Sequence, residues 1–218
     1  MSDIKKAILL SAGFGTRLRP VTDNLPKCLV PINGKPLLQI WLEQLTKAGF
    51  TEFLINSHYL AEQVECFIKD SAYKEQVTIV HESTLLGTLG TLKENQSFWQ
   101  DENVLVAHAD NLCLCDWSAF IAAFNNRQTS CLATMMLFET DTPKTCGIVE
   151  LDQQQQVIAF HEKVTNPPSN LANAAIYIFD KKLRSVVEQL PNQASDISLD
   201  LIPQLIGQLN TWQTNGYL

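Results

Sequence analysis

The sequence contains no apolar run long enough to span a bilayer, and its first residues lead into a short strand-like stretch instead of a signal peptide. Positive charge is also scarce, because 16 Lys and Arg stand against 23 Asp and Glu, which gives a net charge of −7. An acidic chain is a poor partner for nucleic acid. We therefore expect a cytoplasmic protein that binds neither membranes nor nucleic acid.

The six cysteines lack the spacing of a metal site. Cys113 and Cys115 are separated by one residue instead of the two that are usual in zinc sites, and no pair of histidines lies nearby in the sequence. We expect reduced, mostly buried thiols that behave as small apolar side chains.

The composition is that of a folded domain, with 45% hydrophobic and 18% charged residues in 218. Strand-like apolar runs alternate with amphipathic stretches, which predicts an α/β fold with a doubly wound, mainly parallel (mixed), Rossmann-like sheet. The expected strands are 4–10, 53–56, 77–80, 103–107, 130–138 and 174–179, and the expected helices are 36–48, 60–69, 117–124, 197–209 and one that begins near residue 87.

We divide the single domain 1–218 into three regions. The alternating pattern covers about 1–139, a small β-rich lobe with a polar hairpin turn covers about 140–180, and a helical region covers about 181–218. Ligands of doubly wound sheets bind beyond the carboxyl ends of the strands. The loops that begin at Ser11, Glu82 and His108 follow three such strands and should therefore converge.

The first of these loops has the chemistry of a phosphate cradle. Gly13 and Gly15 follow the apolar run Ile4–Leu10 and allow a close approach of the backbone to a ligand. Exposed backbone N–H groups in such a loop bind anions. Arg17 adds a fork that can hold a phosphate with two hydrogen bonds, and Lys27 adds a compact positive charge.

Charge is distributed in keeping with this cradle. Residues 1–35 hold six basic and two acidic residues and therefore carry a net charge of +4. Since the whole chain carries −7, the remaining residues carry −11. A positive region on an acidic body attracts a small polyanion.

Two common phosphate motifs do not fit. Leu18 stands where the dinucleotide fingerprint needs its third glycine, and the second strand is not followed by an acidic residue for a ribose. Gly34–Lys35 is followed by Pro36, and Leu29 stands where the Walker pattern requires glycine. An NAD-type oxidoreductase is therefore disfavoured.

The segments Ser11–Pro20, Pro26–Lys27 and Pro31–Pro36 together resemble the signature of the sugar-1-phosphate nucleotidyltransferases, the nucleoside-diphosphate-sugar pyrophosphorylases. Leu85–Gly90 is similar to the segment with which this family reads the base, and Asp110 falls where the family holds Mg²⁺. Four further blocks match the family: Gly147–Glu150, Phe160–Lys163, Asn173–Phe179 and Asp196–Pro203.

The resemblance implies transfer of a nucleotidyl group from a nucleoside triphosphate to a sugar 1-phosphate, with release of pyrophosphate and with Mg²⁺ as cofactor. Residues 1–139 would then bind the nucleotide, and the lobe would bind the sugar. A carboxylate such as Glu82 can accept from guanine N1–H and N2–H₂, which favours GTP with a mannose- or heptose-type 1-phosphate. Thymidylyl or uridylyl transfer to glucose 1-phosphate is the alternative.

The resemblance also assigns individual residues. Catalytic roles fall on Arg17, Lys27 and Asp110, with Asp110 as metal ligand; nucleotide binding falls on Ser11, Ala12, Gly13, Gly15, Thr16, Arg17, Glu82, Gly87 and Thr88; sugar-phosphate binding falls on Gly147, Glu162, Lys163 and Asn173. From the residues alone, Asp110 could instead form a turn or a helix cap, and Glu162–Lys163 could be an exposed ion pair.

The sequence departs from the family near its end. Family members continue past a Gly-Tyr segment into an Asp-x-Gly-Thr block, whose Asp is a second metal ligand, whereas this sequence ends at Thr214–Leu218. Asp200 falls in a predicted helix and is not expected to replace that ligand. The two hypotheses are an active enzyme that holds metal with one carboxylate and a catalytically impaired homologue that binds sugar nucleotides. The sequence leaves the oligomeric state open and is compatible with a homo-oligomer.

Overall fold

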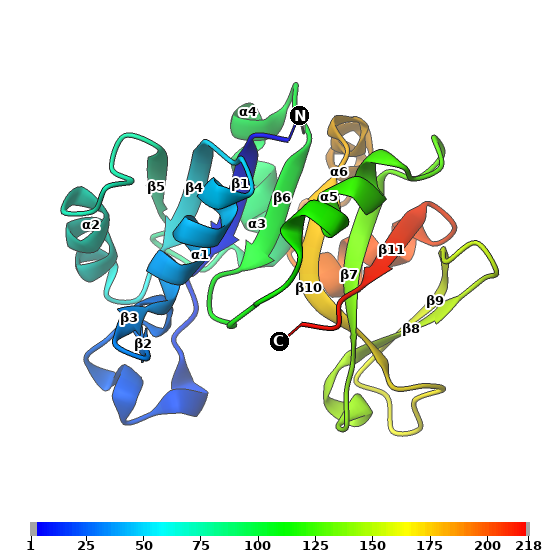
Figure 1. Cartoon of the computed structure of the whole chain (residues 1–218), viewed down its shortest axis with the longest axis horizontal. Helices are drawn as coiled ribbons and strands as arrows, with labels where there is room; N and C mark the ends of the chain where they lie inside the picture. The colour runs from blue at the N-terminus through cyan, green and yellow to red at the C-terminus, as the bar shows by residue number, and fades with distance from the viewer. Residues whose placement is uncertain (1–3, 217–218) are drawn as a thin grey trace.

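A nine-stranded mixed sheet runs through the computed structural model, which describes residues 4–216 (Figure 1). The strands are β1 Lys6–Leu10, β4 Glu52–Ser57, β5 Val77–His81, β6 Val104–His108, β7 Ala133–Glu139, β8 Gly147–Leu151, β9 Val157–Glu162, β10 Leu171–Phe179 and β11 Leu209–Gln213. The order along the main path is β11-β7-β10-β6-β1-β4-β5, and the hairpin β8–β9 joins β10. Two short strands, β2 Pro31–Ile32 and β3 Lys35–Pro36, form a separate sheet.

The α-helices and short helical turns lie between these strands. The α-helices are α1 Leu37–Lys47, α2 Ala61–Lys69, α3 Gly87–Glu94, α4 Gln96–Trp99, α5 Trp117–Asn125 and α6 Arg184–Gln189. The short turns are η1 Thr16–Leu18, η2 Val21–Asp23, η3 Lys27–Leu29, η4 Pro143–Thr145, η5 Lys181–Leu183, η6 Ile197–Leu201 and η7 Ile202–Leu205. Among the described residues, no helix combines the length and apolar character needed to cross a membrane.

The mainly parallel, mixed sheet predicted from the sequence is confirmed. β1 pairs in parallel with β4 and β6, and β4 pairs in parallel with β5. β10 runs antiparallel to β6 and β7. Because β1, β4, β5 and β6 share one direction, the loops that follow them emerge at one edge of the sheet.

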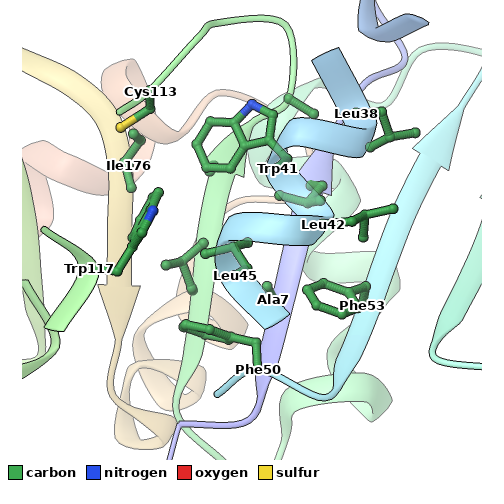
Figure 2. Packing of buried hydrophobic residues seen from close by; sticks show 14 of the residues in the cluster. Ala7, Leu38, Trp41, Leu42, Leu45, Phe50, Phe53, Cys113, Trp117 and Ile176 are labelled. Atoms are coloured by element: carbon green, nitrogen blue, oxygen red, sulfur yellow. The ribbon is translucent and has the colours of Figure 1, made fainter. Parts of the chain in front are cut away.

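Helices cover both faces of the sheet, so the strands at its centre are buried on two sides. One core contains apolar residues of α1, α2 and α5, and the other contains residues of α3, α4, α6, η6 and η7. Figure 2 shows the first of these cores, in which Trp41, Leu42 and Leu45 of α1 pack against the sheet and Trp117 of α5 lies to the side of α1 near Trp41.

α1 forms and ends as its sequence predicts. Its apolar residues recur at helical spacing and are buried against the sheet. Gly49 follows the helix with a φ of 102°. The Phe50 N–H donates to the Leu45 carbonyl (3.0 Å), and the Gly49 N–H donates to the Thr46 carbonyl (3.0 Å). These two bonds make a Schellman motif, which fixes the direction in which the chain enters β4.

The predicted C-terminal helix 197–209 is correct only over residues 197–205, which are helical but do not form an α-helix. The segment forms the short turns η6 and η7 and then the strand β11, which pairs in parallel with β7. Pro203 occupies the first turn of η7, lacks an N–H and prevents one continuous helix. Gly207 then turns the chain with a φ of 79°. Residues 1–3 and 217–218, the two ends of the sequence considered above, lie outside the described range.

The prediction from this core concerns Leu42, which is fully buried on α1. Leu42→Ala should lower the free energy of unfolding by about 2–5 kcal/mol, because it removes buried methyl groups and leaves a cavity. Lys47→Ala, on the exposed side of the same helix, should change it by no more than about 0.5 kcal/mol. Urea denaturation of both variants measures the difference. Equal losses would contradict the packing described here.

Candidate functional site

Two cavities meet at the carboxyl edge of the parallel strands. The smaller, of about 230 Å³, lies among the loop after β1, the end of β4 and the start of α3. The larger, of about 970 Å³, lies between the same edge and the β8–β10 lobe. Lys27, His108 and Asp110 line both cavities. Molecules bound in the two cavities would therefore approach each other at these three side chains.

An ion pair marks this meeting point. The Lys27 Nζ lies 2.8 Å from the Asp110 Oδ2, and the two side chains are 25% and 32% exposed. Lys27 comes from η3 and Asp110 from the loop after β6. An ammonium group has three donors, so the bond to Asp110 leaves two of them available to an anion.

Most of the predicted nucleotide-binding residues line the smaller cavity: Ser11, Ala12, Gly13, Glu82, Gly87 and Thr88. Gly87 has a φ of 77°, and a Cβ at this position would collide with the Ser195 carbonyl. The Leu89 N–H donates to the same carbonyl (2.9 Å). Only glycine therefore lets the start of α3 pack against residue 195 and form this wall.

Glu82 lines the smaller cavity, but its carboxylate is already engaged. Its Oε1 accepts from Asn56 Nδ2 (2.8 Å) and Thr91 Oγ1 (2.6 Å), and its Oε2 accepts from the Leu86 N–H (3.1 Å). A carboxylate offers about four acceptor positions. One position on Oε2 therefore remains for a ligand, whereas recognition of guanine through both oxygens would require breaking this network.

All four predicted sugar-phosphate residues line the larger cavity: Gly147, Glu162, Lys163 and Asn173. The Lys163 Nζ and Glu162 Oε1 form an ion pair of 2.8 Å inside this wall. A Cβ on Gly147 would lie 2.7 Å from the Glu162 Oε2 and would also collide with the Phe160 ring. Glycine at 147 therefore leaves room for the Glu162 carboxylate.

Asn173 shapes the wall of this cavity as well as lining it. Its Nδ2 donates to the Tyr177 hydroxyl (2.7 Å), and its Oδ1 accepts from the Ala175 N–H (2.9 Å). Ala175 has a φ of 55°, and the register of β10 with β7 shifts between residues 173 and 177. The side chain thus stabilises a bulge that turns this part of β10 toward the cavity.

Three predicted residues lie away from the cavities. Within the described chain, Gly15, Thr16 and Arg17 are absent from both linings, although Leu18 lines the larger cavity. Thr16 and Arg17 are exposed on η1. Gly15 accepts from the Thr22 hydroxyl (2.7 Å) and has a φ of 65°, so it turns the loop. The role of Arg17 in binding phosphate stays a prediction.

Sequence reasoning assigned no binding or catalytic role to Asn56, Thr91, His108 or Asp196, which surround or support the cavities. Burial lowers the pKa of His108, and the Lys27 charge lowers it further, against the opposing effect of Asp110 and Asp196. The imidazole is therefore neutral at pH 7. A polar residue that ends an apolar strand, as His108 does, is the signal that could have identified it.

Asp110, the predicted metal ligand, is the one carboxylate of the described residues that lines both cavities. Among residues 4–216, no group of three or more His, Cys, Asp or Glu side chains could hold a metal. Asp200 accepts from the N–H groups of Ser195 (2.7 Å) and Asp196 (2.9 Å), and Asp196 caps η6 through the Leu199 N–H. Asp200 therefore has a local structural role, as expected for a residue in a helical turn.

Comparison with known proteins identifies the family. The profile of the nucleotidyl transferase family matches residues 6–214. The chain belongs to this family.

Individual members differ in the substrates that their names state. A UTP–glucose-1-phosphate uridylyltransferase of Synechocystis is 32% identical over 92% of this chain, and a putative mannose-1-phosphate guanyltransferase of Sulfolobus acidocaldarius is 30% identical over 92%. The chain spans about half the length of these relatives, 55% and 54%. The fold matches that of a putative glucose-1-phosphate thymidylyltransferase from Bacillus anthracis, solved in complex with a sucrose, with a TM-score of 0.85 and 22% identity over 98% of this chain and 88% of that one.

The predicted thiols are free, but only Cys28, Cys113 and Cys131 are buried, so the expectation of mostly buried cysteines holds for half of them. Cys28 lies beside Lys27, and burial raises the pKa of its thiol to about 12.

Since the thiolate is the reactive form, Cys28 should resist alkylation at pH 8 while the exposed Cys66 reacts. Iodoacetamide labelling followed by peptide mass spectrometry measures both rates. Equal labelling of the two residues would contradict the burial of Cys28.

Proposed function

We propose that this protein joins a nucleoside triphosphate and a sugar 1-phosphate into a nucleoside-diphosphate sugar and releases pyrophosphate. The observation that carries the proposal is the wall of Lys27, His108 and Asp110 that the two cavities share. It would hold the α-phosphate of a triphosphate in the smaller cavity next to a sugar phosphate in the larger one. Family membership and the substrates named for its relatives support the same reaction.

The chemistry needs no protein nucleophile. A phosphate oxygen of the sugar 1-phosphate attacks the α-phosphorus, an O–P bond forms, and the bond to the pyrophosphate leaving group breaks. The protein then has to bring two anions together and offset their repulsion. Lys27 would contact the α-phosphate, Lys163 the incoming phosphate, and Arg17 the departing pyrophosphate.

The residues present fit one hard cation in cooperation with the substrates. Mg²⁺ is commonly bound through one or two carboxylates together with substrate phosphates, and Asp110 supplies a carboxylate that faces both cavities. When bound, Mg²⁺ would neutralise phosphate charge. Asp110 also holds Lys27 in place (2.8 Å) and keeps its ammonium at the junction.

We propose GTP with a mannose- or heptose-type 1-phosphate as the preferred pair. The one free acceptor position on Glu82 Oε2 can accept from a single N–H donor of the base, and guanine presents two such donors, N1–H and N2–H₂. A guanyltransferase is also among the relatives compared above. Thymidylyl or uridylyl transfer to glucose 1-phosphate is the second candidate, supported by the uridylyltransferase relative.

The six free cysteines fit a reducing compartment, and on that ground we propose the cytoplasm as the location. The net charge of −7 disfavours nucleic acid as a partner, and the local net charge of +4 over residues 1–35 supports the proposal that the partners are small anions.

Removal of the charges at the junction should abolish most of the turnover. Lys27→Ala and Asp110→Ala should each lower kcat by about 10²–10³, because each removes a preorganised charge near the reacting phosphates, and Arg17→Ala should do the same at the leaving group. Lys35→Ala is the matched control, since Lys35 pairs with Glu43 outside both cavities. Pyrophosphate release measures the rates. Near-normal turnover in a junction variant would remove that residue from the mechanism.

Assays of each of the four nucleoside triphosphates with mannose, heptose and glucose 1-phosphates identify the substrates. Pyrophosphate release should be fastest with GTP, and indifference to GTP would contradict the preference for guanine. Tight binding of a sugar nucleotide without any pyrophosphate release would instead favour a catalytically impaired binding protein.

A further inference from the structure

The smaller cavity rests on three buried polar side chains: Asn56, Glu82 and Thr91. Their exposed fractions are 4%, 5% and 0%. A buried carboxylate and its partners are stable only when their hydrogen bonds are satisfied, so the groups that satisfy them fix their positions. These three residues form one hydrogen-bonded set next to the smaller cavity, and the set does not lie within a single glycine-containing loop.

Asn56, in β4, connects the two loops that form the cavity walls. Its Oδ1 accepts from the Ser11 N–H (2.7 Å), and the Ser11 hydroxyl returns a hydrogen bond to the Asn56 carbonyl. Its Nδ2 donates to Glu82 Oε1 (2.8 Å) and contacts Thr91 Oγ1 (3.0 Å). Glu82 in turn accepts from the Leu86 N–H (3.1 Å) just before α3. One amide thus links the loop after β1 to the loop after β5.

His58 and Tyr59, which directly follow β4, make further contacts to the same two loops. The His58 Nδ1 donates to the Glu82 carbonyl (2.7 Å), and the His58 ring packs edge-on against Phe14 of the first loop, with centroids 5.3 Å apart. The Tyr59 hydroxyl donates to the Asp23 carbonyl (2.8 Å). The end of β4 therefore contacts both loops through several residues, of which Asn56 is the buried centre.

We propose that Asn56 is a positioning residue for the nucleotide: its amide sets the separation of the Ser11 and Leu86 backbones, and its donor orients Glu82 so that the free acceptor position of Oε2 faces the cavity. The inference rests on the proposed function, since it requires a nucleoside triphosphate in the smaller cavity. The larger cavity shares none of these side chains, so the sugar phosphate should bind independently of them.

Asn56→Asp tests the proposal because it keeps the acceptor for Ser11 but places a second carboxylate against Glu82. The introduced carboxylate would replace an amide that lies 2.8 Å from Glu82 Oε1, and two carboxylates this close repel each other. The dissociation constant of a β,γ-imido nucleoside triphosphate should rise by at least about tenfold, as expected when a buried hydrogen bond is lost. The Michaelis constant of the sugar 1-phosphate should stay within about twofold, a split that general destabilisation would not produce.

A double variant then tests the hydrogen bond itself. Glu82→Gln alone should also weaken triphosphate binding, because an amide N–H₂ would face either the Asn56 donor or the Leu86 N–H. Combined with Asn56→Asp, the glutamine can donate to the introduced carboxylate and still accept from Leu86. The double variant should therefore bind the triphosphate more tightly than Asn56→Asp alone. Losses that simply add would overturn the proposal.

Ser57→Ala is the matched control. Ser57 is the next residue of β4 and is also buried, but its hydroxyl has no hydrogen-bond partner among the described residues. Triphosphate binding should be unchanged in this variant. Thr91→Val, which removes one donor to Glu82 while nearly preserving shape, should weaken triphosphate binding and carries the same test if Asn56→Asp does not fold.

The wild-type protein is first measured with the imido analogues of the four triphosphates, and the tightest one is used for every variant. Failure to bind any analogue would overturn the proposed function together with this inference. Normal binding by the wild type and unchanged binding by Asn56→Asp or, in its place, Thr91→Val would overturn the inference alone.

Discussion

In the proposed reaction, electrostatic repulsion between two phosphates is the constraint on which the site depends. The ion pair that would offset this repulsion has members 83 residues apart, Lys27 on a short turn and Asp110 beyond a buried strand. Parallel pairing of β1 with β6 brings these two segments to one edge. Without the parallel sheet, neither the shared wall nor the positive charge facing both cavities would exist, so topology and chemistry are linked at this point.

The parallel sheet and the phosphate-binding character of the first loop could be predicted from local signals, whereas most of the individual site residues follow from the resemblance to the nucleotidyltransferase family. Apolar runs that alternate with amphipathic helices predict the sheet, and glycine loops with nearby cations predict anion binding from the chemistry of a few adjacent residues. Gly87 and Gly147, predicted to bind the nucleotide and the sugar phosphate, line the smaller and the larger cavity respectively, and the collisions that require glycine there are visible only in the structure.

The remainder depends on contacts between distant residues. Asn56 lies 26 residues from Glu82 and 45 from Ser11, and nothing in a single strand reveals that its amide joins two loops. β11 was missed because it lies in the region 181–218 that was predicted to be helical, although the predicted helix 197–209 overlaps this strand at Leu209 alone. Residues 209–213 form a strand because they pair with the edge of β7, which is distant in the sequence. Arg17 shows the opposite case, since its motif is clear while its side chain lies outside both cavities.

A crystal structure of the protein with an imido triphosphate and a sugar 1-phosphate bound together tests the shared wall most directly. The proposed arrangement predicts the triphosphate in the smaller cavity, with its α-phosphate beside Lys27 and Asp110, and the sugar phosphate in the larger cavity beside Lys163. A triphosphate bound away from Gly13 and Lys27, or a sugar phosphate that does not approach the α-phosphate at this junction, would contradict it.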